Sequence, residues 1–362
     1  MTRQLVTIRT VNELIPIEGA DRIELARVDG WQCVVKKGDF SVGDMGMYFE
    51  IDSLLPADDA RWAFLEPRKF RIKSMKLRGA LSQGLLMPMN TLTPQEKMRN
   101  LTEFDTGLAD ILGVQKFEPP VPIGGEQKGT FPTHLVPKTD QERIQNMPKV
   151  LEGRSSSQFE ITEKLDGTSF TAWYFRDPEF EFDADDPQID IIQNVLVGVA
   201  SRNWEMKLDD DNVYAKIFHQ HELKRKLCAM DRNLAIQGEI IGGRVQGNKY
   251  KRGTQELYVF DIYDIDAKKY VDAAERMRLV AELGLRHVPV PSYFELFKDI
   301  PEAQPVQQGD GGMYLTLDLV LRLAEGKSML HDTQREGLVF KCLTDAGLTF
   351  KAISNKFLLK HE

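Results

Sequence analysis

The sequence predicts a two-domain protein in which a small all-β module precedes a larger α+β domain. Up to about residue 115, short apolar runs are separated by turn residues with no helix-period stretch between them, which is typical of a small barrel or sandwich. Beyond that point, strand-like and helix-like patterns mix. The length of 362 residues suits this division, at roughly 150 residues per domain.

The N-terminal part is expected to contain hairpins. Arg22–Val28 alternates apolar and polar residues, Asp29-Gly30 offers a two-residue turn, and Trp31–Val35 returns as a second strand. Another strand is expected over Met45–Ile51.

A segment rich in proline and glycine follows, from Glu118 to Pro137, with five prolines and three glycines. Such a density disfavours any periodic element and predicts a linker. We therefore expect a boundary near residue 125, with domains at 1–125 and 126–362.

The second domain is expected to combine strands and helices. Helical patterns cover Ala215–Met230 and Ala273–Leu283. Strands are expected over Phe159–Glu163, Thr168–Phe175, Ala235–Ile241, Glu256–Ile262, Arg335–Cys342 and Leu348–Ile353.

Composition excludes several classes of protein. The net charge of −8 argues against a basic protein that coats nucleic acid by charge alone. Three widely separated cysteines make a disulfide framework or a thiolate zinc site improbable and favour a reducing compartment. No apolar run is long enough to span a membrane, and the N-terminus lacks a signal-peptide core. A cytoplasmic monomer without a membrane partner is expected.

Two stretches of the chain have a local charge that differs strongly from its moderately acidic average. Residues 68–78 carry six cations and no carboxylate, and the chain from Asp177 to Asp190 is crowded with carboxylates. The acidic stretch is typical of a solvated loop. The basic run is either a solvated edge strand or a strand whose cationic face binds phosphates, and we favour the second. The nucleic-acid contacts expected there are Arg71, Lys73, Lys76 and Arg78.

One short string carries the strongest chemical signal, EKLDGTSF from Glu163 to Phe170. A lysine at a strand end followed by x-Asp-Gly resembles the K-x-D-G motif of covalent nucleotidyltransferases, the superfamily of polynucleotide ligases and mRNA capping enzymes. Alone this tetrad is weak, because a hairpin with an Asp-Gly turn and an exposed lysine gives the same pattern.

Further matches follow in the order of that superfamily and make coincidence untenable. They are Ser201-Arg202-Asn203, Gln237-Gly238-Glu239-Ile240-Ile241-Gly242, Val259-Phe260-Asp261-Ile262, Glu336-Gly337-Leu338-Val339-Phe340-Lys341 and Phe350-Lys351-Ala352-Ile353. They resemble motif Ia, motif III, the aromatic motif IIIa, motif IV and motif V.

The order of the two domains indicates which members of this superfamily the chain resembles. DNA ligases and capping enzymes carry an OB barrel after motif V, whereas only nine residues follow Ile353 here and no Arg-x-Asp-Lys string occurs. The β-rich module, with FSVGDMGMYFEIDSLLP and RIKSMKLRG, stands in front, and Thr139–Asn146 (TDQERIQN) precedes the lysine. This arrangement is similar to the ATP-dependent RNA ligases with an N-terminal OB domain. The implied fold is an all-β OB-like barrel followed by an α+β nucleotidyltransferase domain of antiparallel sheets with helices, ATP-grasp-like.

The resemblance implies ATP, Mg²⁺ or Mn²⁺, and RNA with 3′-OH and 5′-phosphate ends, nicked or structured. Lys164 would be the nucleophile, helped in catalysis by Asp166, Lys341 and Lys351. The metal would be held, largely through water, by Asp166, Glu239 and Glu336. The nucleotide-binding residues would be Arg143, Glu163, Lys164, Arg202, Glu239, Phe260, Val339, Lys341 and Lys351.

Physical chemistry agrees with these residue types. A free lysine is almost fully protonated at neutral pH, so its surroundings must favour the neutral amine. Adjacent cations and a bound metal would do this by disfavouring another positive charge, and Lys341, Lys351 and Arg143 are the candidate cations. One departure is that motif V usually reads Lys-x-Lys, and Lys356 or Lys341 would have to supply the missing charge.

The sequence leaves other interpretations of these residues and of the whole protein open. Glu239 and Glu336 are otherwise strand-end carboxylates in salt bridges, Phe260 is otherwise a core residue, and Arg202 is otherwise a surface arginine. For the whole protein, the rivals are an ATP-dependent DNA ligase, a GTP-using capping-type enzyme, and an inactive nucleic-acid-binding relative.

Overall fold

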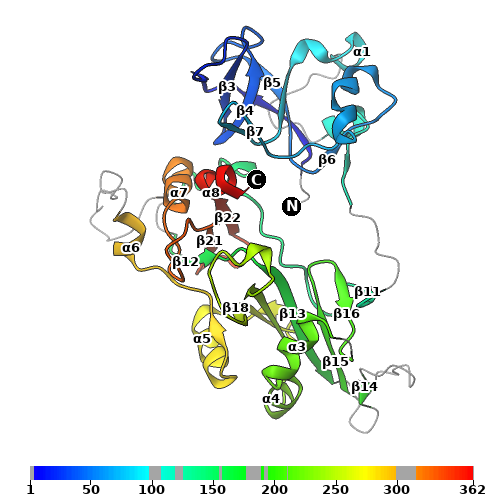
Figure 1. Ribbon diagram of the computed structural model, residues 1–362, viewed down its shortest axis with the longest axis vertical. Helices are drawn as coiled ribbons and strands as arrows, with labels where there is room; N and C mark the ends of the chain where they lie inside the picture. The colour runs from blue at the N-terminus through cyan, green and yellow to red at the C-terminus, as the bar shows by residue number, and fades with distance from the viewer. Residues whose placement is uncertain are drawn as a thin grey trace.

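A computed structural model describes residues 4–97, 107–118, 125–154, 157–176, 189–190, 195–209, 211–298 and 315–361. Its N-terminal module lies at one end of an elongated molecule and the α+β domain at the other (Figure 1). The predicted acidic insertion falls almost entirely outside the described residues. Within these ranges, every helix is too short or too polar to cross a bilayer.

The N-terminal module is mostly β, as predicted. Its strands are β1 (Val6–Thr10), β2 (Glu13–Pro16), β3 (Ile23–Val28), β4 (Trp31–Lys36), β5 (Met45–Phe49), β6 (Ser53–Leu54), β7 (Met75–Leu77), β8 (Ala80–Ser82), β9 (Leu85–Pro88) and β10 (Gln115–Lys116). Its short helices are η1 (Ala60–Arg68), η2 (Met89–Thr91), α1 (Pro94–Lys97) and α2 (Leu108–Ile111).

The described strands of this OB-like module do not join into one closed barrel. They pair as four small sheets, β1-β5-β9, β2-β3-β4, β6-β10 and β7-β8. The β3–β4 hairpin is as predicted: both turn residues have positive φ, 47° at Asp29 and 80° at Gly30, the conformation that a type I′ turn requires. The module is therefore an OB-like set of hairpins around Trp31, Tyr48, Phe49 and Trp62.

The basic run is not one strand with a cationic face, which corrects the sequence-based expectation. It starts at the end of η1, turns through left-handed Lys69 and Phe70, and only its last part forms β7. The Arg71 guanidinium is occupied, because it pairs with Asp52 and lies 3.8 Å from the centre of the Phe117 ring. In contrast, Lys73, Lys76 and Arg78 are exposed.

The C-terminal domain is α+β, as predicted. Its strands are β11 (Gln127–Thr130), β12 (Phe159–Lys164), β13 (Thr168–Arg176), β14 (Ile189–Asp190), β15 (Val195–Ala200), β16 (Trp204–Met206), β17 (Leu234–Gly242), β18 (Gln255–Asp264), β19 (Lys269–Tyr270), β20 (Arg286–His287), β21 (Gly337–Cys342) and β22 (Thr349–Ile353). Its helices are η3 (Ile144–Asn146), α3 (Val213–Gln220), α4 (Leu223–Ala229), η4 (Gln246–Asn248), α5 (Ala273–Glu282), α6 (Tyr293–Phe297), α7 (Leu317–Ala324) and α8 (Asn355–His361).

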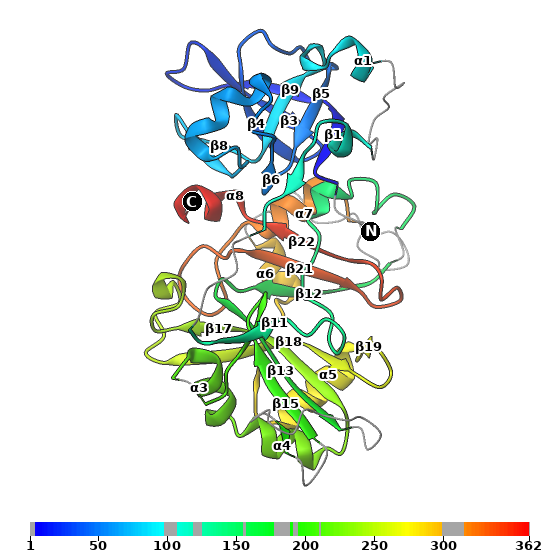
Figure 2. The same cartoon turned by 90° about the vertical axis from the view of Figure 1, so that its right-hand side faces the viewer.

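Two sheets organise this domain. The larger has nine strands, with the path β11-β16-β15-β13-β17-β18-β19, and α3, α4 and α5 pack against it through Ile217, Leu227 and Leu279. The smaller, β12-β21-β22, buries Phe340 and Phe350 with Leu319 and Leu323 of α7. Alternation along the small sheet sends the intervening side chains of β21 and β22 to its other face. The two views in Figures 1 and 2 show the strands of the two sheets meeting in the middle of the domain.

Two predicted segments differ from the structure. The second half of the predicted linker is ordered, because β11 pairs with β16 and Phe131 and Val136 are buried against the large sheet. The helix expected over Ala215–Met230 is broken in two at Glu222, which adopts φ of 51°.

The two domains touch through small, specific contacts. The Arg9 Nη1 atom donates to the Gln145 carbonyl over 3.2 Å, and the Gln83 amide donates to Asn355 over 3.0 Å. Leu81 of β8 packs against Phe357 of α8. Figure 2 accordingly shows α8 between the module and the α+β domain.

Candidate active site

The Lys164–Gly167 segment passes from one sheet to the other. β12 pairs with β21, with Lys164 opposite Gly337, whereas β13 pairs with β15 and β17. The hairpin alternative is therefore wrong. The crossing is tight at Gly167, where a Cβ atom would lie 2.2 Å from the Ile240 carbonyl oxygen, so only glycine fits without a backbone shift.

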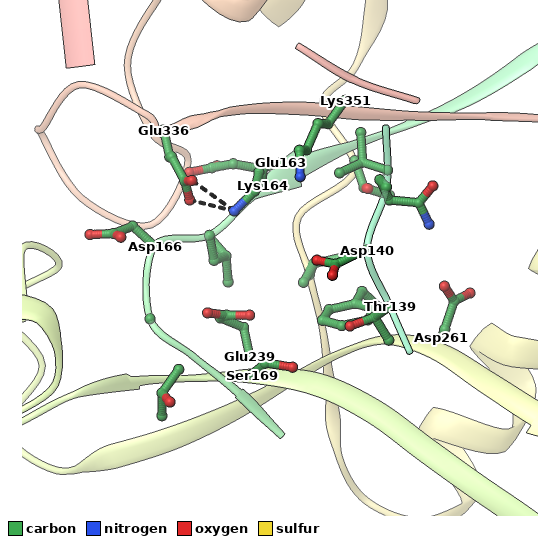
Figure 3. Close-up of a pocket in the computed structure, with 18 of the residues that line it drawn as sticks. Thr139, Asp140, Glu163, Lys164, Asp166, Ser169, Glu239, Asp261, Glu336 and Lys351 are labelled. Atoms are coloured by element: carbon green, nitrogen blue, oxygen red, sulfur yellow. Dashed lines mark hydrogen bonds and ion pairs between the residues drawn. The ribbon is translucent and has the colours of Figure 1, made fainter. Parts of the chain in front are cut away.

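A pocket of about 380 Å³ opens between the two sheets at this crossing. Its walls come from residues of β12, β13, β17, β18, β21 and β22 and from the segment 139–141 (Figure 3). Residues that are distant in sequence thus converge on Lys164.

Lys164 is held by Glu336. Its Nζ atom lies 2.7 Å and 2.8 Å from the two carboxylate oxygens (dashed lines in Figure 3), and 27% of the Lys164 side chain stays exposed. Burial lowers the pKa of Lys164, but the carboxylates, Glu336 first and then Glu239 and Asp166, outweigh burial and leave the pKa raised. Among the protein's own groups, nearby anions therefore outweigh the candidate cations; the lowering of this pKa by cations together with a bound divalent metal stays a prediction.

The carboxylates crowd one another. Burial raises the pKa of Glu239 to about 8; Lys164 opposes this shift, and Glu336 and Asp166 add to it. No group of three His, Cys, Asp or Glu side chains among the described residues is placed to bind a metal directly. Carboxylate oxygens are the ligands of hard divalent cations such as Mg²⁺, which keeps several of its waters when bound. The donor set therefore fits Mg²⁺ or Mn²⁺.

Two lysines of the small sheet face the pocket. The Lys341 Nζ atom donates to Asp261 over 2.7 Å and to the Phe260 carbonyl over 2.9 Å, and burial lowers its pKa. Burial, followed by the charges of Lys164 and Arg143, lowers the pKa of Lys351 to about 7. Lys351 is therefore only partly protonated at neutral pH, and an anion bound beside it would favour its charged form.

Phe260 lies on the pocket wall, at a β-bulge. Gln237 is opposite Asp261 and Gly238 is opposite Val259, so Phe260 has no partner in the β17–β18 ladder. A bulge re-aims side chains, and Phe260 is half-buried: it packs against the cluster around Leu165 and Tyr258 and also lines the pocket. Val339 of β21 lines the pocket from the other sheet.

Other predicted residues are placed differently. Arg202 reaches the pocket and pairs with Asp140. The Arg143 guanidinium instead lies 5.4 Å from the centre of the Trp31 ring in the N-terminal module, and Arg143 is not on the pocket wall. Glu163 lines the pocket, but strand alternation points its side chain away from Lys164, and its carboxylate accepts from the Met329 amide over 2.8 Å.

The sequence analysis missed several residues in or next to the pocket. The main one is Lys249, which does not line the pocket itself but pairs with Asp166 on its wall. Next to it, the Tyr250 hydroxyl accepts from the Asp166 amide over 2.8 Å. Thr139 and Ser169 also line the pocket. Among these, only Lys249 had a usable signal, because it lies in a basic loop directly after the Gln237–Gly242 motif.

Comparison with known proteins gives a consistent result. An OB-fold domain model matches residues 5–89, and an RNA ligase family model matches residues 157–358. No curated protein sequence matches the chain.

Solved structures of the Naegleria gruberi RNA ligase resemble the whole chain. A lysine-to-alanine variant with ATP and Mn is 37% identical, with a TM-score of 0.75 and 99% of both chains covered. A glutamate-to-alanine variant with AMP and Mn is 38% identical, with a TM-score of 0.75 and the same coverage. The structure with PPi is 38% identical, with a TM-score of 0.74 and 99% of each chain covered.

Proposed function

Because the chain belongs to the RNA ligase family, we propose that it joins an RNA 3′-OH to an RNA 5′-phosphate at the expense of ATP. The observation that carries the proposal is the placement of Lys164, with its carboxylate partner, on the wall of a pocket between two sheets. The similar Naegleria structures with ATP, AMP, PPi and Mn support the nucleotide and the metal.

The reaction is proposed to run in three nucleotidyl transfers. Lys164 Nζ attacks the α-phosphorus of ATP, a P–N bond forms, and pyrophosphate leaves. The RNA 5′-phosphate then attacks the lysyl-AMP and takes the adenylyl group. Finally, the 3′-OH attacks the activated 5′-phosphate, and AMP leaves as the phosphodiester forms.

The residues of the chain have separate tasks in the first step. Phe260 and Val339 offer apolar surfaces from opposite sheets to the adenine ring. Lys341, Lys351 and Arg202 offer positive charge to the ribose phosphates. Asp166, Glu239 and Glu336 would hold Mg²⁺ or Mn²⁺, which neutralises phosphate charge and offsets the carboxylates that raise the pKa of Lys164.

A sealing assay on defined ends tests this proposal. We expect ATP-dependent joining of nicked RNA with 3′-OH and 5′-phosphate ends, and no joining of 3′-phosphate and 5′-OH ends. Matched DNA nicks and a GTP reaction address the rival ligase and capping activities. Joining without a nucleotide, or with GTP alone, would contradict the proposal, and no joining at all would favour the inactive relative.

The pKa of Lys351 leads to a proton-linkage prediction. At pH 8 the amine is largely neutral, because its pKa is about 7. Bound phosphates favour the charged form, so ATP binding should take up as much as about 0.9 proton at pH 8 and almost none at pH 5. Calorimetry in two buffers with different ionisation enthalpies measures this uptake. It should disappear in Lys351→Met; equal uptake in that variant would assign the proton to another group.

The exposed cations of the N-terminal module are proposed to bind the RNA backbone. Replacing Lys73, Lys76 and Arg78 by glutamine should leave lysine adenylation nearly intact and weaken RNA sealing. The slope of log affinity against log salt concentration should become shallower by about two units. The reason is that three fewer phosphate contacts form, so fewer counterions are released on binding. Arg71 is kept unchanged in this variant, since its contacts with Asp52 and Phe117 support the fold. Equal loss of adenylation and sealing would instead assign these residues to folding.

A further inference from the structure

The side chain of Lys249 forms an ion pair with the motif residue Asp166. It lies in the loop between β17 and β18, which carries Arg244, Lys251 and Arg252 but no carboxylate. The loop is internally fixed, because the Asn248 side chain bonds both the amide and the carbonyl of Arg252, at 3.0 Å and 2.9 Å.

The position of the Lys249 ammonium is determined from two sides. One side is the Asp166 carboxylate, and each of these two side chains is only 18% exposed. The other is the ring of Phe357 on α8, whose centre lies 4.6 Å from Nζ, a cation–π distance. Phe357 is itself buried with Leu81 of the N-terminal module. This ion pair is therefore built into the structure, unlike an exposed lysine pair that contributes little.

The charges around Asp166 show what this arrangement does. Asp166, Glu239 and Glu336 give the pocket three carboxylates close to Lys164. Lys249 adds a positive charge at the Asp166 end. The Lys249 ammonium repels a divalent cation that approaches Asp166, whereas it attracts an anionic polyphosphate.

We propose that Lys249 is a counter-ion of Asp166 that competes with the divalent cation for this carboxylate. It thereby weakens metal binding and strengthens ATP binding at the same site. The inference rests on the proposed function, because it assumes that Asp166 belongs to the metal-binding carboxylates. Lys249 acts through Asp166 and is a positioning residue.

The test is Lys249→Met, which keeps an apolar stem over Phe357 and removes the charge. Mn²⁺ titrated calorimetrically into the full chain without nucleotide should bind about tenfold more tightly than to the wild type. The KM for ATP in lysine adenylation, at saturating Mn²⁺, should rise. Opposite shifts of the two affinities are the signature, because a purely structural lesion weakens both.

Two matched variants complete the experiment. Lys251→Met removes the same charge from the same loop at an exposed position, and should change neither affinity appreciably. Lys249→Arg keeps the charge and should restore the wild-type Mn²⁺ affinity. Unchanged Mn²⁺ binding in Lys249→Met, or parallel loss of Mn²⁺ and ATP binding, would overturn the inference while leaving the proposed function intact. A wild-type chain that neither binds Mn²⁺ nor becomes adenylated would overturn both.

Discussion

Lys164→Ala is expected to abolish the adenylated enzyme and the ATP-dependent sealing of 5′-phosphate RNA. The reason is chemical: alanine has no amine to form the P–N bond, Lys341 is engaged with Asp261 and Phe260, and Lys351 lies on the opposite edge strand of the small sheet. Loss of a covalent nucleophile should reduce the rate by at least about 10⁴-fold. Incubation with α-labelled ATP and denaturing electrophoresis measures the adduct.

The same variant offers an internal control for folding. RNA that already carries a 5′-adenylyl group bypasses the attack by lysine, so Lys164→Ala should retain more sealing on this substrate than on 5′-phosphate RNA. Loss of sealing on both substrates together with a lowered thermal stability would point to misfolding. A stable covalent AMP on Lys164→Ala would refute the assignment of the nucleophile.

Glu336→Ala is expected to have the second largest effect, through two opposing consequences. Removing the carboxylate 2.7 Å from Lys164 takes away the main influence that raises the pKa of the lysine, which by itself favours the nucleophilic neutral amine. It also removes a carboxylate from the proposed cation site, and this loss of transition-state charge stabilisation should dominate. Adenylation should fall by at least about a hundredfold.

Metal dependence and pH separate these two consequences. Excess chelator should stop adenylation in the wild type. In Glu336→Ala, the rate should reach its plateau at a lower pH than in the wild type, because the pKa of Lys164 falls. Glu256→Ala, which removes a carboxylate outside the pocket, is the matched control. A Glu336→Ala enzyme as active as the wild type would contradict the proposed role of this carboxylate.

The sequence was sufficient for most of the catalytic domain because its signals are local. β17 is an almost continuous apolar run, α5 has a helical pattern of apolar residues, and short motifs located Lys164, Glu239 and Glu336. The sequence did not predict how these elements are arranged in three dimensions. Sequence spacing does not show whether strands joined by Asp166-Gly167 share a sheet, and the structure places them in two.

Other differences have similarly specific causes. The β-bulge that presents Phe260 depends on the register of β17 against β18, which no single strand encodes. Arg143 is close in sequence to pocket residues but extends toward Trp31, a contact created by domain packing. Lys249 lies in an irregular loop, where neither strand nor helix periodicity indicates the direction of a side chain.

The position of the adenylyl group in the protein decides whether Lys164 is the covalent nucleophile. Incubation of the full chain with ATP and Mn²⁺, followed by intact-mass measurement and peptide mapping, should show one adenylyl group per chain, attached to the peptide that contains Lys164. The adduct should disappear on addition of pyrophosphate, which reverses the transfer. An adduct on another residue, or no adduct with a metal and nucleotide series that spans Mg²⁺, Mn²⁺, ATP and GTP, would contradict covalent nucleotidyl transfer through Lys164.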